Sequence, residues 1–318
     1  MVVASDLVGC RYRLVQRRAH PEMPRTHASI ARAERHAAAV EAVMQMLPRR
    51  GSGRFRRIDL EGDEWERSMR TLEAVVSGYT HITNAVFATE EWMVHVDVLL
   101  REGDKYTPII VSNHRVARKN DTKTTLAVPT HRLGLSEPLE APYKLRHHAV
   151  DGYRLAFAAR ALQDLGLDSG RGGAIGQDRT RAFFTDTARF DLERAWNQPL
   201  PTAPVRVKEC ASCRFWSLCE PELVAADDIS LFLSGDRAKP YRERGITSVQ
   251  ALIDADLGEP SRLAAAWRAG EVLLRRGDVN VPRADVEVDV DMEAYLDQGA
   301  YLWGVWHDGE YIPFVTWE

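Results

Sequence analysis

The spacing of apolar residues predicts three amphipathic helices in the first half of the chain. Apolar side chains recur at three- and four-residue intervals over 28–46, 63–77 and 145–165, which is the period of a helix with one buried face. Between the last two ranges, 94–100 and 106–111 are short runs rich in β-branched residues. The Gly and Asp residues that join these runs are typical of a hairpin turn. The pattern therefore predicts helices that flank a sheet.

The second half of the chain changes texture. The glycine-rich stretch 166–180 is expected to be a loop that leads into a strand at 181–184, because clustered glycines interrupt regular structure. After residue 223, polar helical runs on either side of Gly245 predict short helices joined by a glycine turn. This segment is expected to be a small helical hairpin.

The last part of the chain alternates strictly between apolar and polar residues. This alternation predicts a strand over 286–293, and the aromatic-rich runs 301–306 and 311–317 predict two more. The chain stops on the last of these strands, so we expect a truncated domain here. The sequence thus divides into three expected domains: 1–222, 223–280 and 281–318.

Composition places the chain among globular proteins. It has 318 residues, of which 45% are hydrophobic, with 42 Lys and Arg against 46 Asp and Glu, enough for about two domains. No apolar run approaches the roughly 18 residues of a membrane span, and the first residues lack the apolar core of a signal peptide. A cytoplasmic protein with no membrane partner is the expectation.

Charge is unevenly distributed along the chain. Residues 1–60 contain 12 Lys and Arg but 5 Asp and Glu, whereas residues 281–318 contain 1 and 9. Because the basic segment is far from the acidic tail, a phosphate-binding face is compatible with the net charge of −4. An ordinary solvated basic face is the alternative.

The four cysteines fall into one pattern. Cys10 lies near the N-terminus, and Cys210, Cys213 and Cys219 follow at separations of two and five residues. In a reducing compartment such thiols are more often metal ligands or free thiols than disulfides. Four thiolates form a complete ligand set for zinc or for an iron–sulfur cluster, and a shared centre would close a very long loop. Zinc, iron–sulfur and unconnected cysteines all remain open from spacing alone.

The order of these cysteines around helices and a hairpin resembles the iron–sulfur branch of the RecB-like PD-(D/E)XK nucleases. AddB-type members of that branch hold a 4Fe–4S cluster with such a set. The resemblance implies that Cys10, Cys210, Cys213 and Cys219 ligate one 4Fe–4S cluster. It also implies that 1–222 is a restriction-endonuclease-like α/β (α+β) core with helices flanking a mixed sheet.

Further motifs extend the resemblance to the catalytic residues. The segment 5–10 looks like the opening helix of the family, His36 like its helical active-site histidine, and Asp97 like the metal-binding aspartate of the first hairpin strand. The resemblance therefore implies hydrolysis of phosphodiester bonds with Mg²⁺ or Mn²⁺ held near Asp97 and His36. The substrate would be nucleic acid, in DNA repair, recombination or nucleic-acid processing.

The second hairpin strand departs from the family. Ile110 and Ser112 stand where the family has the Glu and Lys of its Glu-x-Lys motif, and the helix motif Gln-x-x-x-Tyr falls on 153–157 without the expected pair. A hard cation prefers anionic oxygen ligands, which Ile110 cannot supply. Asn113 could replace a ligand only through a bulge. The alternatives are an active nuclease and a catalytically dead iron–sulfur protein that binds nucleic acid or acts as a scaffold, with His36 and Asp97 as hydrogen-bonded core residues.

Two later segments also resemble parts of a multidomain bacterial subfamily of these nucleases. The segment 245–249 resembles its helix-hairpin-helix, although the turn 235–237 has an acid in place of a second glycine, which favours packing over phosphate binding. The segment 288–293 resembles the first strand of an RNase H-like exonuclease domain. There, Asp291 and Glu293 share one face and would supply two of the metal ligands of a partial DEDD-type site.

Basic residues after the altered strand are candidates for contact with phosphates. Arg115, Arg118, Lys119 and Lys123 form the first group. A second group precedes the next expected helix: Arg132, Lys144, Arg146, His147 and His148. Such residues supply the salt-dependent part of nucleic-acid binding, and ordinary exposed loop charge is the alternative. The expected partners are nucleic acid, DNA before RNA, and a helicase or another repair protein.

Overall fold

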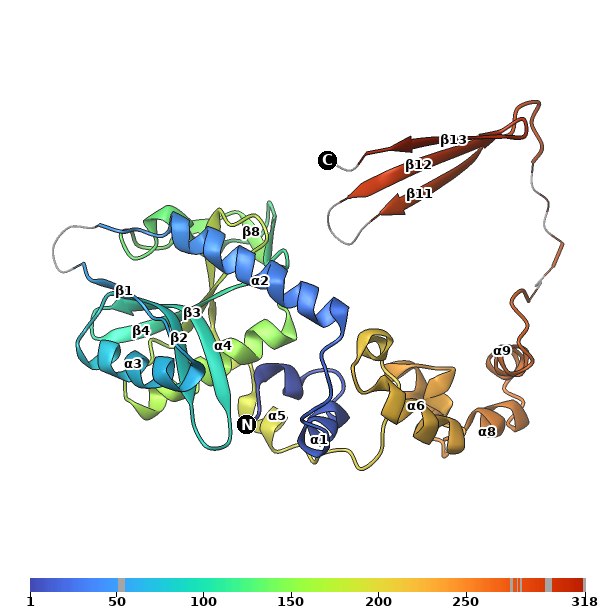
Figure 1. The fold of residues 1–318 in the computed structure, drawn as a ribbon, viewed down its shortest axis with the longest axis horizontal. Helices are drawn as coiled ribbons and strands as arrows, with labels where there is room; N and C mark the ends of the chain where they lie inside the picture. Colours follow the sequence, from blue (N-terminus) through green and yellow to red (C-terminus); the bar gives the residue numbers. More distant parts are fainter. Residues whose placement is uncertain (51–54, 275–276, 279, 281, 295–298, 317–318) are drawn as a thin grey trace. The chain divides into compact units, whose positions relative to one another are not determined.

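The computed structural model describes all residues except 51–54, 275–276, 279, 281, 295–298 and 317–318 (Figure 1). The chain forms two compact units, Met1–Ala264 and Ala265–Glu318, and each is described by itself. Within the described residues, none of the helices combines the length and the apolar character that crossing a membrane requires.

The first unit is built on a mixed eight-stranded sheet. Its strands lie in the order β1-β2-β3-β4-β9-β10-β6-β7. The β1–β2 and β4–β9 pairs are parallel and the others antiparallel. Their bounds are β1 (Arg57–Asp59), β2 (His81–Ala88), β3 (Met93–Glu102), β4 (Lys105–Val111), β6 (Thr125–Pro129), β7 (Leu139–Ala141), β9 (Arg171–Ile175) and β10 (Arg181–Asp186). A separate antiparallel ribbon consists of β5 (Ala117–Lys119) and β8 (Tyr143–Leu145).

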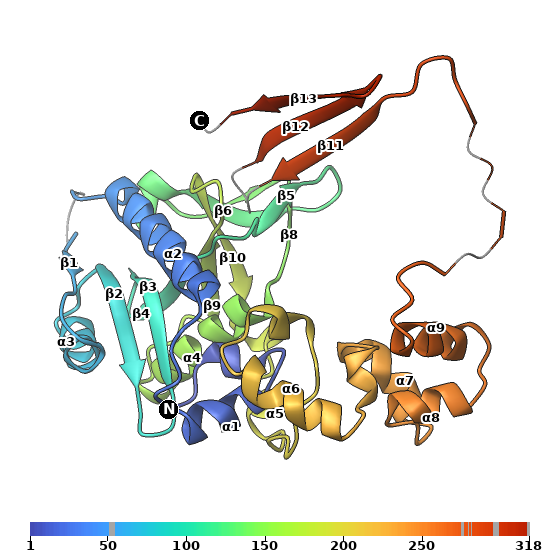
Figure 2. The same cartoon turned by 45° about the vertical axis from the view of Figure 1, so that its right-hand side comes forward.

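Helices cover both faces of this sheet (Figures 1 and 2). Val43 and Met44 of α2 pack on one core cluster, and Phe157 and Leu162 of α4 pack on another. The helices are α1 (Tyr12–Ala19), α2 (His27–Met46), α3 (Glu64–Val76), α4 (Ala149–Asp164), α5 (Leu192–Trp196), α6 (Trp216–Ala225), α7 (Lys239–Arg242), α8 (Val249–Asp254) and α9 (Glu259–Arg268). Short 3₁₀ turns are η1 (Ala4–Leu7), η2 (Thr130–Arg132), η3 (Thr187–Arg189), η4 (Lys208–Ser212), η5 (Ile229–Leu231) and η6 (Gly235–Ala238). The predicted arrangement of helices flanking a sheet is confirmed.

The periodic segments fold as expected. The ranges 28–46, 63–77 and 145–165 contain α2, α3 and α4, and the two β-rich runs form the β3–β4 hairpin. Two expectations are wrong. The segment 5–10 forms only the η1 turn, and the stretch expected to be a loop contains β9.

The glycines of β9 explain the second error. Gly172 and Gly173 lie where an added Cβ would meet side chains of the packed layers, at 3.0 Å from Leu155 Cδ2 and 2.4 Å from Ile109 Cδ1. Glycine inside a strand marks such close approach. These residues therefore allow tight packing in the middle of the sheet.

The second unit contains an antiparallel sheet of β11 (Asp289–Ala294), β12 (Ala300–His307) and β13 (Glu310–Val315). The three predicted strands are thus confirmed as far as the described residues reach, since residue 317 lies outside them. Asp291 pairs with Gly304 and Glu293 with Leu302, so the two acids share one face of β11. Both are exposed. The chain is therefore a mixed α/β protein with a large mixed sheet and small antiparallel sheets.

Candidate functional site

The carboxylate of Asp97 lies in the interior of the first unit. Asp97 belongs to β3 and its residue is 6% exposed. Its Oδ2 accepts a hydrogen bond from the Val111 amide at 2.6 Å and another from Arg154 Nη2 at 3.0 Å. A buried carboxylate is costly unless it is paired and hydrogen-bonded. Asp97 therefore has its own partners within the protein.

Arg154 closes this site from α4. Besides Asp97, its guanidinium donates to the carbonyl of His95 at 3.1 Å and to that of Val111 at 3.4 Å. One cation thus joins β3 to the end of β4. The sequence prediction missed Arg154, although a signal was present. It stands beside the buried run Leu155–Ala159, and an arginine within a buried helix face needs an acidic partner.

The second-strand residues lie where they cannot replace the missing ligands. Ile110 is 0% and Ser112 2% exposed, and Ser112 Oγ donates to Asp151 Oδ2 at 2.6 Å. Asn113 Oδ1 accepts from Arg179 Nη2 at 2.7 Å. Ser112 Oγ and Asn113 Oδ1 are therefore each bound to a neighbouring side chain.

His36 faces the same group of charges from α2. Burial lowers the pKa of His36; the negative charges of Asp97 and Asp151 oppose this shift, and the positive charges of Arg154 and Arg179 reinforce it. His36 and Asp97 are therefore close enough for their charges to interact, whereas the described hydrogen bonds to Asp97 come from Val111 and Arg154. The lowered pKa makes His36 a neutral imidazole at pH 7.

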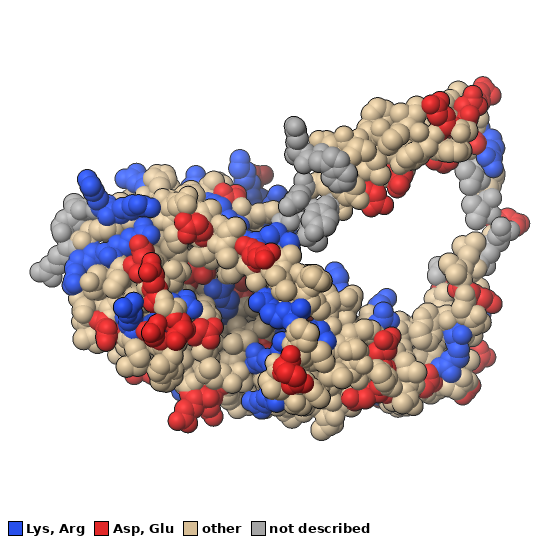
Figure 3. Space-filling model, viewed as in Figure 1, with Lys and Arg blue, Asp and Glu red and all other residues tan. Residues whose placement is uncertain are grey.

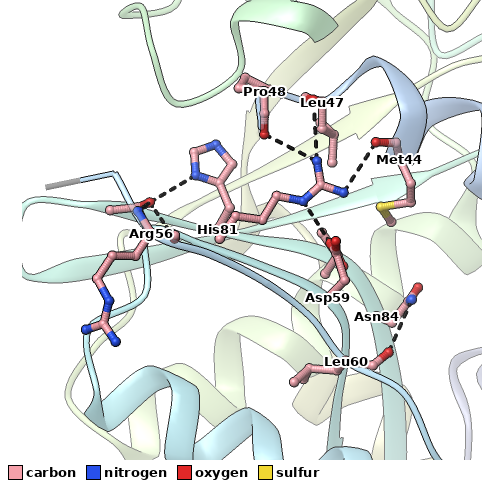
Figure 4. Close-up of polar contacts among 11 residues, drawn as sticks. Met44, Leu47, Pro48, Arg56, Asp59, Leu60, His81 and Asn84 are labelled. Carbon is pink, nitrogen blue, oxygen red and sulfur yellow. Dashed lines mark hydrogen bonds and ion pairs between the residues drawn. The ribbon is translucent and has the colours of Figure 1, made fainter. Parts of the chain in front are cut away.

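The position of α2 is fixed at its C-terminal end. Figure 4 shows the carbonyls of Met44, Leu47 and Pro48 converging on one guanidinium, which belongs to Arg57, at 3.3, 3.4 and 3.2 Å. The same guanidinium donates to Asp59 at 2.8 Å. A basic side chain at the last carbonyls of a helix satisfies acceptors that have no partner inside the helix. Arg57 therefore anchors the helix that carries His36.

No cation site is formed around Asp97 by the side chains described. Across the described ranges, no group of three or more His, Cys, Asp or Glu residues is placed so that it could hold a metal ion. Asp97 and His36 alone leave a divalent cation without a sufficient set of anionic ligands. Binding of Mg²⁺ or Mn²⁺ here stays a prediction.

The four cysteines line one small cavity. Cys10 lies just before α1, Cys210 in η4, Cys213 at the end of η4 and Cys219 in α6, and all four border the same cavity. The remaining lining residues are mainly apolar: Arg13, Gln16, Pro204, Val205, Phe215, Trp216 and Leu223. Soft thiolate ligands in an apolar shell suit zinc or an iron–sulfur cluster. Their chemistry fits such a group, although they are not arranged around a single ion.

Polar contacts hold the cysteine segment against the N-terminal helices. Thr26 Oγ1 donates to the carbonyl of Ser212 at 3.2 Å, and Arg214 Nη1 donates to that of Met23 at 2.8 Å. Gln16 Nε2 approaches Cys219 Sγ at 3.7 Å. These contacts join segments about two hundred residues apart along the chain. The cavity therefore forms only when the N-terminal segment meets the segment 204–223.

Burial also sets the protonation of these thiols. It raises the pKa values of Cys10 and Cys210 and raises that of Cys219 to about 11. Without a bound cation, these three thiols are protonated at neutral pH. Because metal ligation requires thiolates, loading of this cavity releases protons and becomes weaker at low pH.

Part of the predicted set of phosphate-contacting residues lies at the β5–β8 ribbon. Arg115, Arg118 and Lys119 line one groove together with Tyr143, and Arg118 pairs in register with Lys144. The three cations are exposed, and none forms an ion pair with another described residue. Lys123 is also exposed but is not part of the groove lining. The ribbon thus presents unpaired positive charge beside an aromatic ring.

The other two predicted sites are the turn at Gly235 and the acidic pair Asp291 and Glu293. The amide of Gly235 donates to the Arg206 carbonyl at 2.8 Å, so this turn is engaged in packing. Asp291 Oδ1 accepts from the Met292 amide at 2.9 Å. With Glu293, Asp291 supplies two acids on an exposed strand. The role of this pair as part of an exonuclease site stays a prediction.

Comparisons with protein-family models, curated proteins and solved structures found no match. The inference of function therefore rests on the geometry of three places in the first unit. These are the closed site at Asp97, the cysteine-lined cavity and the basic groove of the ribbon.

Proposed function

We propose that the first unit is a RecB-like, restriction-endonuclease-like domain that binds nucleic acid without cleaving it. The observation that carries this proposal is the pairing of Asp97 with Arg154 and with the Val111 amide. In metal-dependent hydrolysis an aspartate of this kind holds the cation that activates water. Here the carboxylate holds a guanidinium instead.

The second strand supports the same conclusion. Ile110 offers no ligand and Ser112 is bound to Asp151. Arg154 neutralises Asp97 from within the protein, so a divalent cation gains less from binding there than at two free carboxylates. We therefore expect a nuclease fold without nuclease chemistry.

The proposed nucleic-acid-binding surface is the basic groove of the β5–β8 ribbon. Arg115, Arg118 and Lys119 are exposed and free of ion pairs with the described side chains, as backbone-phosphate contacts require. Tyr143 adds an aromatic face on which a base can stack. The proposed partner is nucleic acid, and a helicase or another repair protein is the proposed context.

The cysteine cavity is proposed to hold a 4Fe–4S cluster with a structural role. Its four thiols come from two segments about two hundred residues apart, so a shared centre would cross-link the fold. The cluster would restrict the unfolded chain and add metal–ligand bonds to the folded state. Zinc is the alternative for the same ligand set.

An active nuclease is the second candidate function. The observation in its favour is that His36 and Asp97 lie within one group of interacting charges. This function requires Arg154 to leave Asp97 when a cation and a phosphate arrive. A cleavage assay distinguishes the active nuclease from the protein that only binds nucleic acid.

The test uses the full chain purified without oxygen. A visible spectrum and analysis of iron, sulfide and zinc identify the group in the cavity. Cleavage of labelled single- and double-stranded DNA and RNA is then measured with Mg²⁺ and Mn²⁺, beside Asp97→Ala. We expect salt-sensitive binding and no cleavage by either protein. Cleavage that Asp97→Ala abolishes would establish an active nuclease instead. A colourless protein whose four thiols bind zinc would rule out the proposed 4Fe–4S cluster.

The groove is tested with matched charge variants. Arg118→Ala combined with Lys119→Ala removes two proposed phosphate contacts, so the slope of log affinity against log salt should fall by about 2. Arg160→Ala is the control, because Arg160 is exposed but already paired with Asp164. Equal losses in both variants would place the binding surface elsewhere.

A further inference from the structure

Helix α3 carries its large apolar side chains on the outside. Four of them form an exposed row that we call the α3 stripe: Trp65 (65% exposed), Met69 (51%), Leu72 (37%) and Val76 (88%). The residues that α3 buries carry short side chains: Ser68, Thr71, Ala74 and Val75. A surface helix normally turns its large apolar residues towards the core. The reversed arrangement marks a surface that another molecule covers.

The helix is held rigidly without any partner. Asp63 Oδ1 accepts hydrogen bonds from the amides of Trp65 and Glu66 at 2.8 and 2.9 Å, and Glu66 Oε2 accepts from the Asp63 amide at 3.2 Å. This reciprocal cap fixes the first turn. On the buried side, Thr71 Oγ1 accepts from the Val86 amide of β2 at 3.0 Å. The α3 stripe is therefore preformed, and binding to it requires little ordering of the helix.

The spacing of the α3 stripe is that of a helix-pairing seam. Its residues follow one another at intervals of four, three and four, which are the alternating a and d positions of a heptad repeat. Four such residues over the 13 residues of α3 span about 20 Å along the helix axis. A single partner helix of three to four turns covers such a seam.

Charges beside the α3 stripe define the partner. Glu66 and Glu73 follow Trp65 and Leu72 directly and therefore occupy the flanking e positions, where interhelical ion pairs choose the partner. Further acids lie at or before the start of the helix: Glu61, Asp63 and Glu64, all exposed. Figure 3, seen from the same side as Figure 1, shows acidic side chains gathered over the region of α3. A second copy of this chain packed antiparallel would oppose these glutamates with glutamates, which costs free energy.

We propose that the α3 stripe is a docking site for an amphipathic helix of another protein whose apolar seam is flanked by lysine and arginine. The apolar seam supplies the buried area, and the basic flanks meet Glu66 and Glu73. The same two glutamates disfavour acidic helices and an antiparallel second copy of this chain.

The probe is a synthetic helical peptide with leucine at its a and d positions and lysine at e and g. A matched peptide carries glutamate in place of every lysine. Both are labelled and titrated with the full chain by fluorescence anisotropy. We expect the lysine peptide to bind at least about tenfold more tightly than the glutamate peptide, because flanking charges decide coiled-coil pairing.

Surface variants connect this binding to α3. Met69→Glu should weaken binding of the lysine peptide by about tenfold or more, because it places a charge in the centre of the seam. Leu139→Glu is the control, since Leu139 is 72% exposed on β7. Glu73→Lys should narrow the preference for the lysine peptide, and circular dichroism verifies that each variant is folded.

Three results would overturn the proposal. Equal affinity for the two peptides would show apolar adhesion without charge selection. If the lysine peptide does not bind, or if Met69→Glu leaves its binding unchanged, α3 is not a docking site. Sedimentation that reveals a dimer of the full chain, lost in Met69→Glu, would assign the α3 stripe to a second copy instead.

Discussion

The cysteine cavity and the site at Asp97 are both assembled from segments far apart in the sequence. They differ in whether their polar side chains are paired within the protein. The cavity collects a full set of four soft ligands in a mainly apolar shell. At Asp97, Ile110 and Ser112 stand where a Glu and a Lys are expected, and the buried Asp97 carboxylate is bound by Arg154. One region has the four thiols of a proposed ligand set, although they are not arranged around a single ion, and the other is a closed network of internal hydrogen bonds.

This difference separates what the fold needs from what catalysis needs. The proposed centre on the four thiols would act on stability whether or not any chemistry occurs at Asp97. The Asp97–Arg154 pair likewise joins β3 to the end of β4 without a metal. Under the proposed function, the architecture and the basic groove would persist although the residues expected to hold a catalytic cation are replaced.

The largest expected effect comes from the cysteine cavity. Cys210→Ser should abolish loading of the proposed cluster and lower the melting temperature by about 10 °C, because metal binding contributes folding free energy. Metal analysis and thermal unfolding under anaerobic conditions measure both effects. Ser212→Ala is the matched control, since only the carbonyl of Ser212 contacts α2 through Thr26. Unchanged metal content in Cys210→Ser would show that the thiols are unconnected.

The next effect is expected at the closed site. Arg154→Met keeps the length of the side chain but leaves Asp97 buried without its cation, which should cost about 3 kcal/mol of unfolding free energy. Adding Asp97→Asn removes the unpaired charge and should recover part of this loss. Urea unfolding of the single and double variants gives the coupling energy. Additive losses would mean that the pair seen at 3.0 Å contributes no coupling.

Acid should weaken the sheet region through its histidines. Burial lowers the pKa values of His36, His81 and His95 below the ordinary 6.5. Below pH 6.5 the unfolded chain therefore binds more protons than the folded chain, so the unfolding free energy falls as the pH falls, by up to about 1.4 kcal/mol per pH unit for the fully buried His81. Above pH 6.5 this contribution is fully present.

His81→Gln provides the measurement. His81 is 0% exposed and its Nε2 contacts the Leu133 carbonyl at 2.9 Å, a contact that a glutamine amide can replace. Urea unfolding at pH 7.5 and pH 5.5 should show a smaller loss in this variant than in the original protein. An identical loss in both would assign the acid sensitivity to other groups, such as the cysteine centre.

The smallest effect concerns the helix between the two regions. Thr26 at the start of α2 touches the cysteine segment, His36 lies within α2, and Arg57 anchors its end. Arg57→Met should cost about 1–2 kcal/mol, because several carbonyls lose a charged donor. Arg50→Ala, at an exposed position in the same connection, is the control. Loss of the cluster in Arg57→Met would show that the two regions are coupled through α2.

Local patterns were enough to predict the elements that carry the sites. The three-to-four-residue period gave α2, α3 and α4, and the turn chemistry gave the β3–β4 hairpin, because these signals act between residues close in the sequence. The same patterns failed at β9, because Gly172 and Gly173 are there to let side chains of other elements pack closely against the strand. They also could not decide which face of α3 is buried.

The sequence by itself determined α2, α3, α4 and the β3–β4 hairpin, the unusual set of four cysteines and the absence of a Glu-x-Lys motif. Only the tertiary structure decided that the four thiols share a cavity, that Arg154 occupies the carboxylate of Asp97 and that Trp65 faces solvent. These outcomes depend on contacts between residues tens to hundreds of positions apart. Such contacts are set by how helices and strands pack, and no local pattern of apolar and polar residues specifies them.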